Sequence, residues 1–97
     1  MLFRSSVVEG PAVSHRHNLD LALEAAILEL LSHRGAGKTI CPSEAARLVD
    51  PSGWEELMDK ARDAARRLVA QGEIVITQRG KIIDPSQAKG PIRLKLR

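Results

Sequence analysis

The sequence predicts an α+β domain, with helices up to about residue 71 and strands after it. Two observations support this fold class. Apolar residues recur at helical spacing in the first part of the chain, and the apolar period then changes to two. Gly72 stands at the change, where a helix commonly ends in a left-handed conformation. The chain has 97 residues, 43% apolar and 28% charged, which is enough for one domain with one core.

A first helix is expected from about residue 18 to about residue 33. Asn18 suits the N-cap, and Asp20 would lie in the first turn, where the helix dipole favours a negative charge. The predicted core face consists of Leu19, Leu23, Ala26, Ile27, Leu30 and Leu31. The preceding residues 1–17 contain Gly-Pro and show no periodicity, so we expect a mostly flexible tail before a domain of residues 18–97.

The segment GAGKT, at residues 35–39, resembles the end of a phosphate-binding loop. That pattern, G-x-x-x-x-G-K-[ST], needs a first glycine at position 32, which is Ser32, and a strand rather than a helix before it. Pro42 also removes a backbone N–H that could hold phosphate. We therefore expect no nucleotide binding, and we predict that Gly35 and Gly37 reverse the chain after the first helix.

A short second helix is expected between Pro42 and Pro51. Proline suits the first helical position, and the residue before a proline avoids helical geometry. Cys41 would lie near the N-cap with Glu44 three residues on, as in a capping box whose usual Ser or Thr is replaced. A cysteine at a helix N-terminus can be reactive, but no acid–base pair accompanies Cys41, which favours a structural role.

A longer third helix is expected to begin at the S-x-x-E capping box of Ser52 and Glu55. Its predicted core side consists of Trp54, Leu57, Met58, Ala61, Ala64, Ala65 and Leu68. Its other side is charged, with possible pairs Glu56–Lys60, Asp59–Arg62 and Asp63–Arg67. Each such pair is worth only a few tenths of a kcal/mol, about 0.2–0.5.

Three strands are expected after Gly72. EIVITQ and KIID form a hairpin around a tight Arg79-Gly80 turn, closed by Asp84-Pro85. In the final GPIRLKLR, apolar and basic residues alternate, which predicts a strand with one apolar and one basic face. With a short extended piece at Thr39-Ile40, the order is helix, short strand, short helix, long helix and hairpin. This is the order of a winged helix, in which helices two and three form a helix-turn-helix and the hairpin is the wing.

Three stretches of the chain resemble a family of small bacterial proteins catalogued as a domain of unknown function: TICPSEAARLV, WEELMDKARDAARRLVAQGEIVITQRGKIIDP and GPIRLKLR. The resemblance covers roughly residues 19–97 and implies a winged-helix-like fold. It supplies no established activity, substrate or cofactor. Some members of that family carry an added cysteine-rich segment that could hold zinc. This chain has a single cysteine, so that feature is absent.

Charge is distributed unevenly along the chain, although the net charge is only +3. Residues 1–59 contain five Lys or Arg and nine Asp or Glu, whereas residues 60–97 contain ten and three. A basic half of this kind could attract a polyanion or could simply be solvated. In helix-turn-helix proteins the start of the recognition helix meets base edges in the major groove. Here that start carries Glu55, Glu56 and Asp59, which phosphates would repel.

Duplex DNA binding through the wing and the final strand is the first functional hypothesis. The candidate residues are Arg62, Arg66, Arg67, Arg79, Lys81, Arg93 and Lys95. The alternative for the third-helix arginines is a solvated face of ion pairs.

A protein-interaction module is the second hypothesis. Leu21, Ala25 and Leu28 form a spare apolar strip on the first helix, which a second copy or a protein partner could cover. Apolar residues of the tail, namely Leu2, Phe3, Val7 and Val8, could also fold back onto it. Residues 92–96 could add a strand to a partner's sheet.

Other functional classes are disfavoured. Phe3 and Trp54 are the only aromatic residues, too few for a platform that stacks single-stranded bases. The histidines and the cysteine lack the spacing of a tetrahedral metal site, and no nucleophile–base pair or carboxylate dyad indicates an enzyme. We expect no cofactor and no metal. No apolar run reaches the roughly 18 residues of a membrane span, and the pattern of a signal peptide is missing, which favours the cytoplasm.

Overall fold

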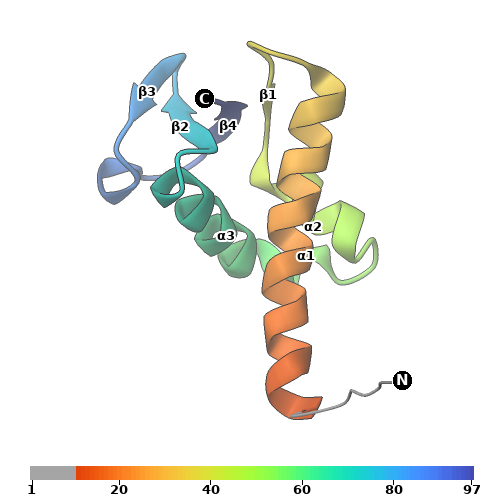
Figure 1. The fold of residues 1–97 in the computed structure, drawn as a ribbon. Helices are drawn as coiled ribbons and strands as arrows, with labels where there is room; N and C mark the ends of the chain where they lie inside the picture. Colours follow the sequence, from red (N-terminus) through yellow and green to blue (C-terminus); the bar gives the residue numbers. More distant parts are fainter. Residues whose placement is uncertain (1–10) are drawn as a thin grey trace.

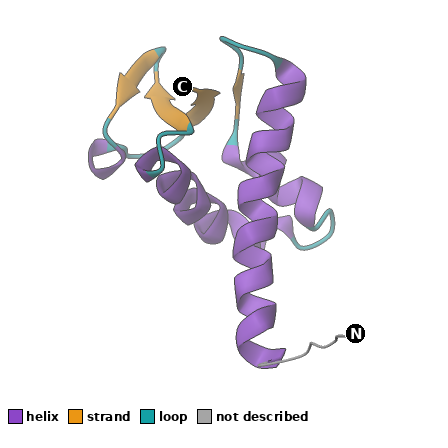
Figure 2. Cartoon of the chain, in the orientation of Figure 1, coloured by secondary structure: helices purple, strands orange, loops and turns teal. Residues whose placement is uncertain are grey.

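The computed structural model describes residues 11–97, with side chains from residue 18 onward. Three helices come first: α1 (Pro11–Arg34), α2 (Pro42–Val49) and α3 (Met58–Ala70), with a 3-10 turn at Trp54–Leu57. The strands are β1 (Thr39–Ile40), β2 (Ile74–Gln78), β3 (Lys81–Ile83) and β4 (Arg93–Leu96), with a second 3-10 turn at Pro85–Gln87. The predicted α+β class is confirmed, and the arrangement is compatible with a winged helix (Figures 1 and 2).

The four strands form one antiparallel sheet in the order β1-β4-β2-β3. The last strand is therefore inserted between β1 and the β2–β3 hairpin; we call this hairpin the wing. The expectation that residues 92–96 could add a strand to a partner's sheet is wrong, because β4 is paired on both sides. Ile40, Leu94, Ile76 and Ile83 lie opposite one another across the sheet. Directly opposed side chains share a face of a sheet. This row faces the helices, and all but the partly buried Ile83 are fully or almost fully buried.

The opposite side of the sheet, which we call the outer face, carries two further rows. One row contains Thr39, Lys95 and Val75, and the other contains Arg93, Thr77 and Ile82. Ile82 is 65% exposed and Arg93 is also exposed, whereas Thr77 between them is buried. The predicted alternation of β4 between an apolar and a basic face is thereby confirmed.

The core lies between the helices and the inner face of the sheet. From α1 it takes Leu23, Ile27 and Leu31, which are fully buried, as the helical spacing predicts. From α3 it takes Ala61, Ala64, Ala65 and Leu68. The three alanines have short side chains, so the backbone of α3 can lie close to its neighbours. The N-terminal half of α1 extends past the rest of the domain (Figure 1).

The start of α1 differs from the prediction. The helix begins at Pro11, so Asn18 is not its N-cap. Proline suits the first helical turn, and no glycine or proline interrupts the chain between Pro11 and Gly35. Residues 11–17 thus belong to α1 rather than to a tail. The apolar residues expected to fold back, Leu2, Phe3, Val7 and Val8, lie outside the described residues.

The predicted capping box of Ser52 and Glu55 is wrong. The 3-10 turn that precedes α3 has no side-chain cap. Instead, Asp50 Oδ1 accepts hydrogen bonds from the backbone N–H of Ser52 at 3.2 Å and of Gly53 at 3.0 Å, and from Ser52 Oγ at 3.3 Å. An aspartate readily forms such a turn with the backbone two or three residues on. Asp50 therefore organises the turn between α2 and α3.

The predicted caps of the other helix ends are confirmed in large part. The backbone N–H of Cys41 donates to Glu44 Oε2 at 2.9 Å, which is half of a capping box at the start of α2. At the end of α3, the N–H of Glu73 donates to the carbonyl of Leu68 at 2.9 Å and the N–H of Gly72 to that of Val69 at 3.0 Å. These two bonds form a Schellman motif.

The GAGK turn reverses the chain after α1. Gly35 and Gly37 have φ of +98° and +81°, and nothing lies within 4 Å of where their Cβ atoms would be. The glycines are therefore required by backbone conformation and not by a close contact. The turn joins a helix to a strand, the reverse of the order in a phosphate-binding loop.

Candidate nucleic-acid interface

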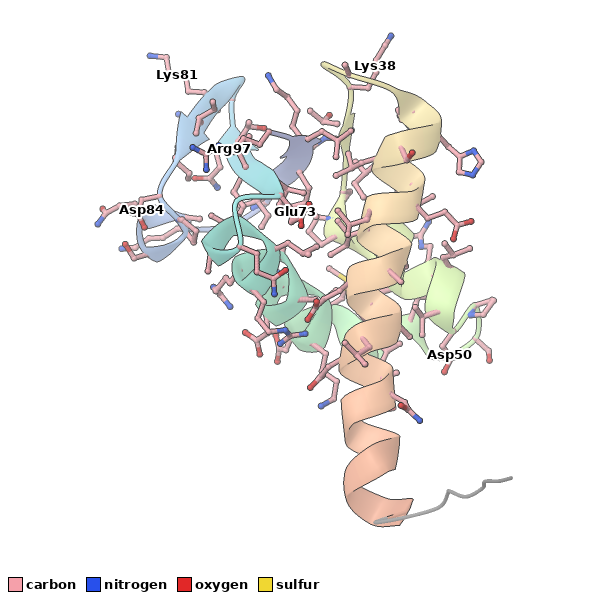
Figure 3. All side chains as sticks on the ribbon, in the orientation of Figure 1. Lys38, Asp50, Glu73, Lys81, Asp84 and Arg97 are labelled. Atoms are coloured by element: carbon pink, nitrogen blue, oxygen red, sulfur yellow. The ribbon has the colours of Figure 1, made fainter. Side chains whose placement is uncertain are left out.

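The exposed basic residues of the wing and β4 lie on or between strands that contain no acidic residue. None of the four strands contains Asp or Glu. Arg93 and Lys95 alternate with the fully buried Leu94 on β4, so both basic side chains project from the outer face. Lys81, at the start of β3, is exposed and points away from the domain (Figure 3).

The wing turn adds a fourth cation. Arg79 and Gly80 form a two-residue turn between paired Gln78 and Lys81, and both have positive φ, +53° and +81°. This is the geometry of a type I′ turn, whose first position is usually Asn, Asp or Gly. An arginine there carries backbone strain. Its side chain is exposed at the tip of the wing.

Arg93 is held in place by β1. Its Nε donates to Thr39 Oγ1 at 3.0 Å, and its Nη2 reaches the carbonyl oxygen of Thr39 at 3.4 Å. Arg34, the last residue of α1, donates to the same carbonyl through Nη1 at 3.0 Å. A guanidinium carries five N–H donors, so these contacts leave Arg93 with further donors for a ligand.

Glu44 balances the charge of Arg34. The two side chains form an ion pair with a distance of 2.6 Å between Arg34 Nη2 and Glu44 Oε1. Burial raises the pKa of Glu44, but hydrogen bonds from Arg34 and from the Cys41 backbone, with the charges of Arg34 and Arg93, lower the pKa overall below 4.5. Glu44 is thus ionised at neutral pH, and its direct ion pair is with Arg34 rather than Arg93.

A groove lies between the wing turn and the loop that leads into β4. It has a volume of about 550 Å³ and is lined by Gln78, Arg79, Lys89, Pro91 and Arg93; we call it the wing groove. Gln78 Nε2 donates to the carbonyl oxygens of Lys89 and Pro91, at 2.5 and 2.8 Å. Sequence reasoning missed Lys89 because residues 84–91 show no periodicity and no motif brings that loop to the wing.

The arginines of α3 lie elsewhere. Arg67 Nε donates to Glu24 Oε2 of α1 at 2.5 Å, so this residue joins two helices. Arg66 pairs with Asp63 at 2.7 Å, the partner predicted for Arg67. Arg62 Nη1 reaches the carbonyl oxygen of Gly90 at 3.4 Å and so adjoins the loop beside the wing groove. Of the seven candidates, the structure thus gathers Arg79, Lys81, Arg93 and Lys95 on the wing and β4.

The apolar strip predicted on α1 is only partly exposed. Leu21 is 47% exposed and Ala25 is also exposed. Leu28 is partly buried and packs against the core. The exposed strip therefore narrows to the part of α1 near Leu21.

The described residues hold no group of three or more His, Cys, Asp or Glu that could bind a metal ion. No helix among them has both the length and the apolar character of a membrane span.

Comparison with known proteins supports the resemblance seen in the sequence. No curated protein matches the chain. The family described as a protein of unknown function, DUF3253, matches residues 20–97, which is most of the chain and includes α2, α3 and the whole sheet. The chain therefore belongs to the DUF3253 family.

Proposed function

We propose that this protein binds duplex DNA by gripping backbone phosphates with the wing and the outer face of the sheet. The observation that carries the proposal is that four basic residues lie in the wing turn and on two strands that contain no acidic residue, namely Arg79, Lys81, Arg93 and Lys95. Among the side chains that the structure describes, Arg79, Lys81 and Lys95 form no ion pair. Unpaired cations of this kind are the usual phosphate contacts of DNA-binding proteins.

The third helix is a poor candidate for major-groove reading. Glu55, Glu56 and Asp59 are exposed where it begins, and these carboxylates would repel phosphates. Arg66 and Arg67 are engaged by acidic partners. The wing and β4 therefore lead the proposed contact, and base-specific readout by α3 has no support.

A duplex is favoured over single strands because the outer face has no aromatic residue. Trp54, the only aromatic residue with a described side chain, packs partly against the core. Its ring lies under the guanidinium of Arg47, 4.3 Å from it, on a different element from the wing. Proteins that bind single strands without sequence preference stack bases on aromatic side chains.

The test compares two pairs of lysines. The first double variant carries Lys81→Gln and Lys95→Gln, and it removes one exposed and one half-buried lysine from the proposed interface. The control double variant carries Lys38→Gln and Lys60→Gln. It also removes one exposed and one half-buried lysine, from other parts of the chain. Binding of a labelled random-sequence duplex is measured by fluorescence anisotropy in about 0.1 M salt. The first pair is expected to weaken binding roughly tenfold or more, since each lost phosphate contact lowers the salt slope by about 0.9.

The control pair is expected to change the affinity by less than about threefold, through net charge alone. Equal losses for the two pairs would mean that only net charge matters, and the proposed interface would be wrong. Absence of binding by the parent protein at low salt would reject DNA binding altogether.

A second candidate function is self-association through α1, which the exposure of Leu21 favours. Sedimentation equilibrium of the parent protein and of Leu21→Glu tests it. A parent dimer that the substitution dissociates would support this function, whereas a monomeric parent would reject it. Leu28→Glu is a worse probe because Leu28 packs against the core.

A further inference from the structure

The loop at the entrance of β4 is held in a fixed position beside the wing. Gln78 is the last residue of β2, and both protons of its amide are used by the carbonyl oxygens of Lys89 and Pro91. Arg62 of α3 reaches the carbonyl oxygen of Gly90 between them. Three successive carbonyls are therefore bound by side chains from two other elements. Such contacts keep the backbone of Lys89 in place relative to the wing turn.

Basic residues from three segments line the wing groove. Arg79 comes from the turn, Lys89 from the loop and Arg93 from β4, and no lining residue is acidic. Arginine binds phosphate through paired N–H donors, and lysine binds it as a point charge. The lining has no aromatic side chain, and Pro91 is its one apolar residue. The groove is therefore suited to an anionic group and offers nothing on which a base could stack.

We propose that the wing groove is a seat for a phosphate group and that Gln78 is the positioning residue that keeps Lys89 at this seat. This seat rests on the proposed function, so its ligand is a backbone phosphodiester of the bound duplex. A free phosphate ion has the same chemistry, so the experiment separates these two sources. The volume of about 550 Å³ accommodates a phosphate with its flanking sugars, since small-ligand sites usually measure about 300–1,000 Å³.

Three variants test the seat against a random-sequence duplex over a range of salt concentrations. Lys89→Gln removes an exposed cation, and we expect the slope of log K against log salt to fall by about 0.9. Gln78→Met keeps the charge and length of the side chain but releases the loop. We expect it to weaken binding at least threefold and also to flatten the slope. Gln87→Met is the matched control, because this exposed glutamine forms no side-chain hydrogen bond among the described residues.

The flattened slope of Gln78→Met is the decisive readout, because a merely structural role would not change the number of phosphates contacted. If Gln78→Met unfolds, Lys89→Gln decides the result, since its exposed side chain is not needed for folding. Slopes and affinities equal to those of the parent protein in both variants would overturn the seat and leave duplex binding intact.

A second measurement follows backbone amides by NMR as inorganic phosphate replaces chloride at constant ionic strength. Shifts confined to Arg79, Lys89, Gly90 and Arg93, in a protein that binds no duplex, would support the seat for free phosphate and reject the proposed function. Duplex binding with the expected loss of slope, and no shift with inorganic phosphate, would identify the ligand as the backbone phosphodiester. If Lys89→Gln keeps both the salt slope and the phosphate-induced amide shifts of the parent protein, the seat is wrong for the phosphodiester and for free phosphate alike.

Discussion

Glu44 connects the end of α1 to the start of α2 through its bonds with Arg34 and the Cys41 backbone. Its pKa is lowered below 4.5, because the bonds from Arg34 and Cys41 outweigh the effect of burial. A carboxylate with a lowered pKa in the folded state stabilises the fold at pH values above its unfolded pKa. That contribution is lost as the pH falls from 4.5 through the lowered pKa of the folded protein.

Glu44→Gln is therefore expected to lower the free energy of unfolding by about 0.5–1 kcal/mol at pH 7, a modest value because the ion pair is partly exposed. The difference from the parent protein should shrink as the pH falls below 4.5, where Glu44 becomes protonated and neutral like the substitute. Urea unfolding at several pH values measures this difference in the free energy of unfolding. Glu55→Gln, at an exposed position, is the control. A difference that stays constant down to pH 2.5 would contradict the assigned role of the charge.

Arg79 occupies a backbone conformation that suits asparagine better, with φ of +53°. Arg79→Asn should raise the free energy of unfolding by about 0.5–1 kcal/mol, because Asn tolerates the left-handed region. The same substitution should weaken duplex binding severalfold, because it removes a cation from the wing tip. Thermal unfolding and anisotropy are measured on the same sample. A variant that is more stable and binds DNA as tightly as the parent protein would show that Arg79 has no part in binding.

The residues of the candidate site could be predicted from the sequence only where strand alternation places them. Arg93 and Lys95 alternate with the buried Leu94 and the partly buried Leu96, so their face was predictable. Arg67 follows the same charge pattern as its neighbours, yet it pairs with Glu24. These partners are 43 residues apart, and a contact at that separation leaves no periodic signal. Lys89 was missed because the loop of residues 84–91 shows no periodicity and no motif that would bring it to the wing.

At the scale of elements, the corner between α2 and α3 depends on Asp50 rather than on Ser52. Asp50→Ala should cost about 1 kcal/mol, the usual effect of losing a capping side chain. Ser52→Ala should cost less than about 0.5 kcal/mol, because Asp50 still receives the backbone N–H groups of residues 52 and 53. Urea unfolding of both variants tests this assignment. A larger loss of unfolding free energy for Ser52→Ala than for Asp50→Ala would contradict this assignment and support the capping box of Ser52 and Glu55.

The two longer helices and the strands after Gly72 followed from hydrophobic periodicity, whereas several boundaries did not. The local sequence pattern does not show that residues 11–17 are helical, because their few apolar residues do not recur at helical spacing. Similarly, Ser52 and Glu55 fit a capping box, but Asp50 competes for the same backbone N–H groups and binds them. Local signals therefore predicted the type of each element better than its first residue.

For the molecule as a whole, the sequence predicts the faces of β4 but not its neighbours. Alternation shows which residues of a strand face the core, and it carries no information about which strands lie beside it. The insertion of β4 between β1 and the wing places Arg93 and Lys95 next to β2. Two basic residues of β4 thereby share the outer face beside the wing, although the net charge of the chain is only +3.

The salt dependence of duplex binding tests the central claim most directly. Each phosphate neutralised contributes about −0.9 to the slope of log K against log salt. Replacing Arg79, Lys81, Arg93 and Lys95 together with Gln should flatten the slope by roughly two to four units and weaken binding to every sequence similarly. The fold should change little, because exposed charges contribute little to stability. A quadruple variant with the slope and affinity of the parent protein, or a parent that binds no duplex at low salt, would contradict the account.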